Sequence, residues 1–359
     1  MRLLLAGGGT GGHLFPAVAL AEQLRTEDPE SAVLFVGTEA GLEYRMLPEL
    51  GWPLETIEMS GFAGLGFKQR VLSLFKLTKG FIQSRKILET FQPDVVVGVG
   101  GYASVPVLLA AKLLGIPYLI HEQNAWPGLA NRLLGRWARR VCLSFPDADR
   151  AFHCGATVIT GNPVRIGMED CPEMSLTPPC LLIFGGSLGA HTINKVMTSL
   201  LPQLGCMQDK LKIIHQTGEK DWPEVAEAYK KQGWTNSVVM PFIKEMRDAY
   251  ADASLVICRA GATTLAELAA CGRPSILIPY PHAAGAHQSA NARAMEAKGA
   301  AMVFEERNLV PEHLGKVVKD LLSDRVTLQT MAAAAKATAR QGAAARLLQE
   351  CRLVRTEKI

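Results

Sequence analysis

The 359-residue chain is 48% hydrophobic and 20% charged, which is typical of a globular protein and excludes a disordered one. Because this length exceeds what one hydrophobic core usually serves, two domains are expected. The formal net charge of +4 does not indicate a nucleic-acid partner, and the eight scattered cysteines are typical of reduced cytosolic thiols. Glycines and a proline interrupt the longest uncharged stretch, residues 95–111, so no membrane span is expected.

The first predicted strand, residues 3–5, leads into a glycine-rich turn and then a helical pattern over residues 16–24. Residues 7–12 satisfy the spacing G-x-G-x-x-G, and Glu39 follows the next predicted strand, where a ribose-binding acid would lie. This pattern keeps a nicotinamide-dependent dehydrogenase open as one interpretation. Whatever the ligand, backbone N–H groups at the start of a helix attract anions or polar hydroxyls.

A basic run without any acidic residue covers residues 59–88. Its cations alternate with large apolar side chains, which predicts an amphipathic surface for anionic lipid headgroups. The alternative is a helix whose apolar face belongs to the domain core. The candidate membrane-contacting residues are Phe62, Leu65, Phe67, Lys68, Arg70, Leu74, Phe75, Lys76 and Lys79.

The two halves of the chain repeat one pattern. Residues 3–13, LLLAGGGTGGH, align without a gap with residues 181–191, LLIFGGSLGAH. Downstream, residues 95–97 and 255–257 are each an apolar run that leads to glycine and a helix. Two such pairs in the same order predict two similar doubly wound α/β domains facing each other across a cleft. Prolines interrupt regular structure over residues 161–179, so the boundary is expected there.

Polar groups suited to a nucleotide sugar follow in the second half. The segment 259–267, RAGATTLAE, follows a predicted strand and opens a helix, and its small residues let backbone amides approach a diphosphate. About two turns into this helix, Glu267 can accept both hydroxyls of a ribose. Further on, His287, Gln288 and Asn291 share one helix face and suit sugar hydroxyls.

These motifs resemble, in order and over nearly the whole chain, the bacterial N-acetylglucosaminyltransferases that convert lipid I to lipid II in peptidoglycan synthesis. The resemblance implies the glycosyltransferase B fold, with two Rossmann-like domains. Residues 1–161, joined by a C-terminal helix over 340–359, would form the acceptor and membrane-associated domain, and residues 162–339 the donor domain. The motifs that carry the resemblance are Gly8 to His13, His121 to Asn124, Gly161 to Arg165, Gly185 to Ser187, and Arg259 to Glu267 with His287 and Gln288.

The resemblance also implies a reaction and its partners. N-acetylglucosamine would pass, with inversion, from UDP-N-acetylglucosamine to the muramoyl-pentapeptide of undecaprenyl-diphosphate-linked lipid I. The protein would act as a peripheral protein on the cytoplasmic face of the inner membrane, without a cofactor and without nucleic acid. Two other classes stay open: the dehydrogenase, and a membrane-bound subunit that binds a nucleotide sugar without turning it over.

Residue roles follow from the matching motifs. The backbone of Ile243 would meet the uracil and Glu267 the ribose, while the helix start at 262–264 would neutralise the diphosphate. Some members carry Gln-Gln where this chain has His287 and Gln288, so the role of His287 in sugar recognition stays open. The implied donor contacts are Thr10, Gly11, Gly12, Asn124, Arg165, Ser187, Ile243, Ala262, Thr263, Thr264, Glu267, His287 and Gln288.

Two residues are candidates for the catalytic base, which is needed because a sugar hydroxyl is a poor nucleophile at neutral pH. His13 follows the first glycine turn directly, and an imidazole suits proton acceptance near neutral pH. The alternative is that His13 is a helix-start residue that only shapes the turn. Glu122 ends a predicted strand and could be the base itself or could orient His13.

Asp147 and Asp149 follow another predicted strand and look like the D-x-D ligands of metal-dependent sugar transferases. No essential metal is expected, because this motif lies at the end of the first domain. The diphosphate groups would lie in the second, where helix termini and Arg165 can neutralise them.

Overall fold

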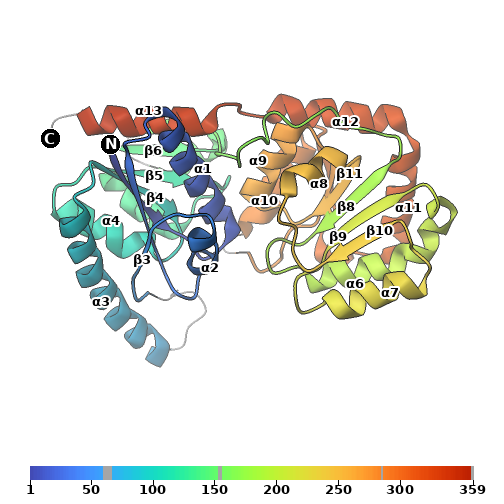
Figure 1. Cartoon of the computed structure of the whole chain (residues 1–359), viewed down its shortest axis with the longest axis horizontal. Helices are drawn as coiled ribbons and strands as arrows, with labels where there is room; N and C mark the ends of the chain where they lie inside the picture. The colour runs from blue at the N-terminus through green and yellow to red at the C-terminus, as the bar shows by residue number, and fades with distance from the viewer. Residues whose placement is uncertain (60–66, 153–155, 284–285, 357–359) are drawn as a thin grey trace. The chain divides into compact units, whose positions relative to one another are not determined.

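The chain folds into two units, Met1–Ile166 with Gly342–Ile359, and Gly167–Gln341 (Figure 1). The computed structural model describes the backbone of residues 1–59, 67–152, 156–283 and 286–356, and the side chains of these residues except 67–74.

A seven-stranded sheet forms the centre of the first unit, in the order β3-β2-β1-β4-β5-β6-β7 with all neighbours parallel. Its central strands are nearly continuous apolar runs because helices cover both faces of a parallel sheet. The strands are β1 (Arg2–Gly7), β2 (Ala32–Gly37), β3 (Leu54–Thr56), β4 (Val95–Gly100), β5 (Tyr118–Glu122), β6 (Arg140–Leu143) and β7 (Thr157–Ile159).

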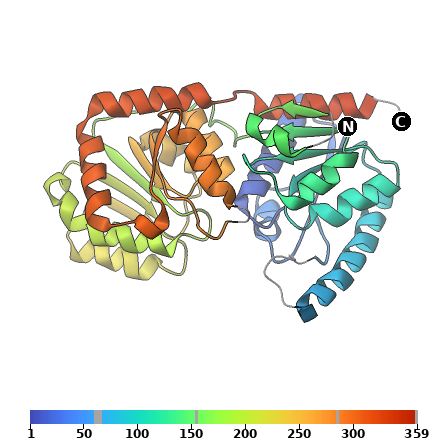
Figure 2. The same cartoon turned by 180° about the vertical axis from the view of Figure 1, so that it is seen from behind.

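Alternate residues of β1 belong to two cores, one on each face of this sheet. Leu3 and Leu5 pack with α1 and α13, whereas Leu4 and Ala6 pack with α4. Figure 2 shows helices on both sides of this sheet. The last helix of the chain therefore completes the core of the first unit. The helices of this unit are α1 (Gly11–Glu27), α2 (Leu42–Glu49), α3 (Phe67–Phe91), α4 (Ser104–Leu113), α5 (Leu129–Leu134) and α13 (Ala343–Thr356).

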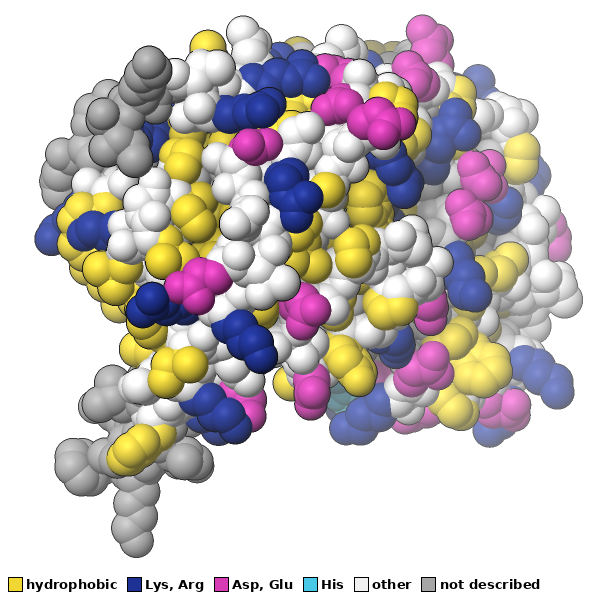
Figure 3. All heavy atoms as spheres, turned by 60° about the vertical axis from the view of Figure 1, so that its left-hand side comes forward, with side chains coloured by type: hydrophobic (Ala, Val, Ile, Leu, Met, Phe, Trp, Pro, Cys, Tyr) yellow, Lys and Arg dark blue, Asp and Glu magenta, His cyan; other side chains and the backbone are white. Residues whose placement is uncertain are grey.

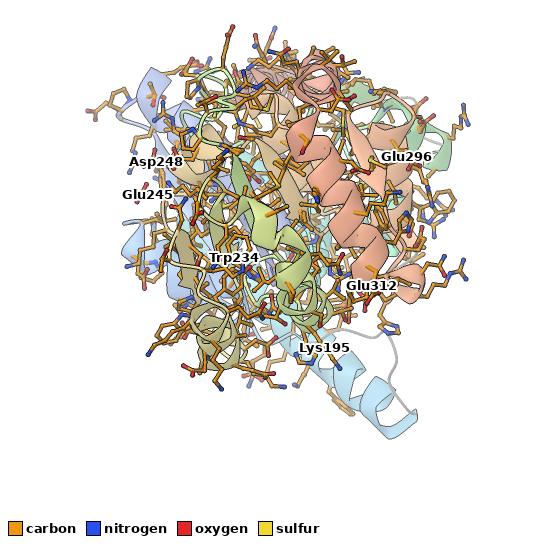
Figure 4. The ribbon with its side chains drawn as sticks, turned by 90° about the vertical axis from the view of Figure 1, so that its right-hand side faces the viewer. Lys195, Trp234, Glu245, Asp248, Glu296 and Glu312 are labelled. Atoms are coloured by element: carbon orange, nitrogen blue, oxygen red, sulfur yellow. The ribbon has the colours of Figure 1, made fainter. Side chains whose placement is uncertain are left out.

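The second unit repeats the plan with a six-stranded parallel sheet in the order β10-β9-β8-β11-β12-β13. Leu181 and Ile183 of β8 pack in a core that also contains Trp234, labelled in Figure 4. The elements are β8 (Cys180–Phe184), β9 (Lys212–Gln216), β10 (Ser237–Met240), β11 (Leu255–Cys258), β12 (Ser275–Leu277), β13 (Ala301–Val303), α6 (His191–Leu200), α7 (Trp222–Lys231), α8 (Met246–Asp252), α9 (Ala262–Cys271), α10 (His287–Glu296), α11 (Pro311–Ser323) and α12 (Arg325–Thr338).

The internal repeat of the sequence corresponds to the same place in the two sheets. Leu3 pairs with Val95 between β1 and β4, and Leu181 pairs with Leu255 between β8 and β11. In each sheet this is where the strand order reverses, the position at which doubly wound folds bind ligands. The predicted pair of doubly wound domains is confirmed.

The burial of α13 leads to a test. Leu348 is 0% exposed, whereas Leu353 on the same helix is 44% exposed. We expect Leu348→Ala to lower the free energy of unfolding by about 2–5 kcal/mol, the range for removing a buried leucine side chain. Leu353→Ala serves as the control and should change stability little. Equal stabilities of the two variants in denaturant unfolding would contradict the packing of α13 in the core.

Candidate functional site

A buried carboxylate supports the first glycine turn. Glu43, 1% exposed, accepts a hydrogen bond from the Gly9 N–H at 2.7 Å and from the Thr38 N–H at 2.9 Å. Gly8 lies at φ +147°, and a Cβ there would come within 2.3 Å of the Glu43 Cδ. Only glycine therefore fits above this carboxylate. Glu43 is not predicted from the sequence, because no motif spacing relates it to the turn.

The expected ligand-binding residues of this turn lie at the start of α1. The Thr10 carbonyl accepts from the N–H groups of His13 and Leu14, which begins the helix. Thr10 is exposed and Gly11 and Gly12 are half-exposed, so polar groups at this helix start reach solvent. The positive end of the helix dipole lies at the same position.

His13 is half-buried, and its ring packs against the end of β4. A Cβ on Gly100 would come within 2.9 Å of the His13 Cε1 and Nδ1 atoms, so glycine makes room for the imidazole. The His13 Nδ1 lies 3.1 Å from the Oε1 atom of Gln123, the residue directly after β5. The carboxyl ends of β1, β4 and β5 thus contribute to one cluster.

Glu122 makes a different set of contacts. Its carboxylate is 1% exposed, and its Oε1 accepts from both the N–H and the side-chain amide of Asn124, at 3.0 and 3.1 Å. Its Oε2 accepts from the Gly128 N–H at 3.1 Å and from the Asn131 amide at 2.8 Å. Glu122 therefore orders the loop after β5, and the side chain beside the His13 Nδ1 is that of Gln123.

Arg165 and Asp149, two further predicted residues of the first unit, each contact a side chain of the same unit. The Arg165 guanidinium lies over the ring of Phe15 in α1, 4.6 Å from its centroid, and so beside the helix that carries His13. Asp149 of the D-x-D motif accepts from the Thr157 hydroxyl at 2.5 Å. Within the described ranges, no three His, Cys, Asp or Glu side chains gather where they could hold a metal ion. The expected absence of a metal stays a prediction.

In the second unit, one glutamine links two of the expected donor contacts. Ser187 is half-exposed in the turn after β8, and the carbonyl of the adjacent Gly186 accepts from the Gln216 Nε2 at 2.7 Å. The Oε1 of the same side chain accepts from the Ile243 N–H at 3.2 Å. Gly189 closes the turn at φ +77°, where a Cβ would lie 1.9 Å from the Thr217 carbonyl oxygen.

The start of α9 follows β11 at the neighbouring strand end. Thr263 and Glu267 are 6% and 2% exposed, and the Tyr250 hydroxyl donates to the Glu267 Oε2 at 3.3 Å. The Asn291 amide of α10 donates to the Ala260 carbonyl at 3.3 Å, and the Gln288 Oε1 accepts from the Tyr280 N–H at 2.9 Å. The first bond connects α10 to the segment before α9, and the second connects the start of α10 to the loop after β12.

Arg259 links two neighbouring strand ends at the same edge of the second sheet. Its Nη1 donates to the carbonyls of Ile278 and Pro279 at 3.2 and 3.1 Å, and it forms an ion pair with Glu306. The arginine of the RAGATTLAE segment therefore joins the ends of β11 and β12.

The basic run 59–88 includes α3. Phe62 and Leu65, and the side chains of Phe67, Lys68, Arg70 and Leu74, lie outside the described residues. Phe75 and Ile82 are 71% and 63% exposed, and Lys79 pairs with Glu58. Figure 3 shows Lys and Arg side chains among exposed hydrophobic ones on this face of the first unit. In the part of the chain that the structure describes, no helix combines the length and hydropathy of a membrane span.

Comparison with known proteins agrees with this architecture. The glycosyltransferase family 28 N-terminal domain matches residues 3–143, and the C-terminal domain of that family matches residues 180–347. A protein of Syntrophotalea carbinolica named UDP-N-acetylglucosamine–N-acetylmuramyl-(pentapeptide) pyrophosphoryl-undecaprenol N-acetylglucosamine transferase is 58% identical over 99% of both chains. A protein of the same name from Geobacter metallireducens is 48% identical over 98% of both.

Among solved structures, Acinetobacter baumannii MurG superposes with a TM-score of 0.77 at 34% identity, over 98% of this chain and 99% of that one. The glycotransferase of kitacinnamycin superposes with a TM-score of 0.72 at 16% identity over 98% of each chain, which shows the shared fold alone. The two doubly wound units, together with the matches to both domain models of family 28, define a glycosyltransferase of the B fold. The chain belongs to glycosyltransferase family 28, so the predicted resemblance is confirmed and the dehydrogenase is not favoured.

The buried histidine beside this site leads to a test by pH. Burial lowers the pKa of His121 to about 4, although the hydrogen bond that its ring donates to the Gly161 carbonyl opposes this shift. The unfolded chain therefore binds a proton near pH 6.5 that the folded protein binds only near pH 4. The contribution of neutral His121 to the free energy of unfolding is fully present above about pH 6.5. It is lost as the pH falls from there to about 4, by on the order of 3 kcal/mol.

We expect His121→Gln to show a smaller loss of Tm than the parent between about pH 7 and pH 5, because the titrating group is gone. His215, also buried and with its pKa lowered to about 3, is present in both proteins and contributes equally. An identical pH dependence in the two proteins would contradict the neutral, buried state of His121.

Proposed function

We propose that the protein transfers N-acetylglucosamine from UDP-N-acetylglucosamine to the muramoyl-pentapeptide of undecaprenyl-diphosphate-linked lipid I, giving lipid II. The observation that carries this proposal is the 58% identity, over 99% of both chains, to a transferase named for this donor and this acceptor. The reaction joins an acceptor hydroxyl to the anomeric carbon, breaks the bond to UDP and inverts the configuration. No cofactor, metal or nucleic acid takes part in this proposal.

The second unit would hold the donor. The Ser187 turn and Ile243 are linked through Gln216, and the start of α9 lies at the end of the neighbouring central strand. In this assignment Ile243 meets the uracil, Glu267 accepts from the ribose, and Thr263 lies at a helix start whose dipole stabilises the charge on the departing UDP.

The nucleotide assignment predicts a loss of affinity in Glu267→Ala. Each charge-assisted hydrogen bond to the ribose contributes roughly 1.5–3 kcal/mol, so UDP should bind more weakly by about tenfold or more in calorimetry. The control is Glu312→Ala, an exposed glutamate on α11 that is labelled in Figure 4 and should leave UDP affinity unchanged. Equal UDP affinity of the parent, Glu267→Ala and Glu312→Ala would contradict the assignment of Glu267 to the ribose.

The first unit would supply the base. We assign this role to His13, whose ring lies at the carboxyl ends of β1, β4 and β5. Glu122 is the weaker candidate, because its two oxygens already accept hydrogen bonds from the loop that it orders. Asn124, held by Glu122, would be a hydrogen-bond partner of a sugar hydroxyl.

Replacing the base should slow the chemical step and spare donor binding. We expect His13→Ala to lower kcat by at least about tenfold with little change in the KM for the donor. The reason is that a positioned base typically accelerates the chemical step by a factor of ~10²–10⁴. Glu122→Gln should cost less turnover than His13→Ala in the same UDP-release assay. The reverse order would transfer the base role to Glu122, and near-normal turnover of both variants would leave the mechanism without its base.

The acceptor is lipid-linked, and we place the protein peripherally on the cytoplasmic face of the inner membrane, with α3 contacting anionic lipids. Phe75 and Ile82 are exposed there beside Lys76 and Lys79. An exposed apolar side chain next to cations fits the boundary between headgroups and acyl chains.

The double variant Phe75→Ser with Ile82→Ser should bind anionic vesicles more weakly in co-sedimentation, because it removes exposed apolar area without touching the core. Its thermal stability and its activity on a short-chain soluble acceptor should match those of the parent. Val326→Ser, 72% exposed on α12, is the control for losing an exposed apolar side chain elsewhere. Vesicle binding by the double variant at the parental level would exclude these side chains from membrane contact.

A further inference from the structure

A chain of polar contacts connects His13 to the buried interior of the first unit. It runs from the His13 Nδ1 to the Gln123 side chain at 3.1 Å, from there to the His121 Nδ1 at 3.1 Å, and from the His121 Nε2 to the Gly161 carbonyl at 3.1 Å. We propose that Gln123 is a positioning residue, which fixes the tautomer of His13 with the proton on Nδ1 and the lone pair on Nε2.

The direction of the hydrogen bonds follows from the carbonyl groups along this chain. A carbonyl oxygen only accepts, and the Gln123 Nε2 lies 2.8 Å from the Val99 carbonyl and 3.3 Å from the His121 carbonyl. The nitrogen of the Gln123 amide must therefore face this interior side. Its oxygen then faces the His13 Nδ1, and an amide oxygen also only accepts.

His121 reinforces the same direction from the other end. Its Nε2 donates to the Gly161 carbonyl, so in the neutral ring the Nδ1 is the acceptor for the Gln123 amide. The Ser144 hydroxyl, 3.4 Å from the His121 Nε2, can accept or donate and does not alter this assignment. Burial keeps His121 neutral by lowering its pKa to about 4. A proton on the His121 Nδ1 would face the Gln123 NH₂ group, donor against donor.

The consequence concerns which nitrogen of His13 takes a proton. With Nδ1–H donating to Gln123, the neutral imidazole accepts at Nε2, and the resulting imidazolium keeps its hydrogen bond to the amide oxygen. Because Gln123 is uncharged, it orients the ring without the charge stabilisation that a carboxylate would give to the imidazolium. This inference rests on the proposed role of His13 as base, but the tautomer itself can be measured without any turnover.

The primary test uses the unmutated protein. In ¹⁵N NMR of histidine-labelled protein at neutral to slightly alkaline pH, the two ring nitrogens of a neutral histidine differ in shift, and the His13 signals are assigned by their loss in His13→Asn. We expect His13 to show a protonated Nδ1 and an unprotonated Nε2. The opposite tautomer, or a rapid mixture of both, would overturn the proposal.

The second test removes the amide. Gln123→Met keeps the length of the side chain and deletes its polar atoms, so His13 should populate both tautomers. Turnover should then fall by about tenfold or more, within the range contributed by a positioned base, with the KM for the donor unchanged.

The matched control is Tyr118→Phe on β5, which deletes a buried hydrogen bond to the Leu134 carbonyl, 2.8 Å long, in the same unit. It should leave both the tautomer and kcat at parental values. A folded Gln123→Met protein that keeps the parental tautomer or the parental kcat would overturn the positioning role.

The outcomes separate this inference from the function on which it rests. In one outcome, the parent shows the expected tautomer, Gln123→Met shifts it, and His13→Ala still turns over normally. The proposed base is then wrong, and Gln123 has no positioning role in catalysis. If His13→Ala is slow and the tautomer is the opposite one, the base stands and the assignment of Gln123 is wrong.

Discussion

Every strand pair that the structure describes in the two sheets is parallel, and this constraint brings the candidate functional residues together. The carboxyl ends of parallel strands meet at one edge, so whatever follows each strand lies together however far apart it is in sequence. In the first unit the edge collects His13, Gly100 and Gln123 from three segments. In the second unit it collects the turn at Gly186 and the segment at Arg259, which follow adjacent strands.

At the edge of the first sheet, two buried carboxylates and one half-buried histidine make different kinds of contact. Glu43 and Glu122 are buried carboxylates whose oxygens accept hydrogen bonds from the loops around them, which compensates the cost of burial. They hold the glycine turn and the loop after β5 in shape. His13 is instead half-buried and contacts an uncharged amide. The two buried carboxylates thus hold the surrounding loops, and the candidate base His13 lies partly exposed beside them.

The fold followed from the sequence because apolar runs, glycine turns and the aligned segments 3–13 and 181–191 are local signals. Element boundaries followed less well: the helix expected over 16–24 begins at Gly11, where the Thr10 carbonyl accepts its first bonds. The contacts of Glu43 with Gly9 and of Gln123 with His13 were not predicted, because their partners are remote in sequence. The contact between Gln123 and His13 spans 110 positions and exists only once β1 and β5 share a sheet.

The helix α13 makes the core of the first unit depend on residues that follow the whole second unit in the sequence. Residues Gly167–Gln341 form one uninterrupted unit, whereas the core of the first unit includes Leu347 and Val354. Because domains generally fold as units while the chain emerges, the second unit can complete its core before the last helix has been made. The core of the first unit, although most of it is synthesised first, stays incomplete until residues Ala343–Thr356 have been made. Until then, α1 lacks the helix α13, against which it packs in the folded first unit.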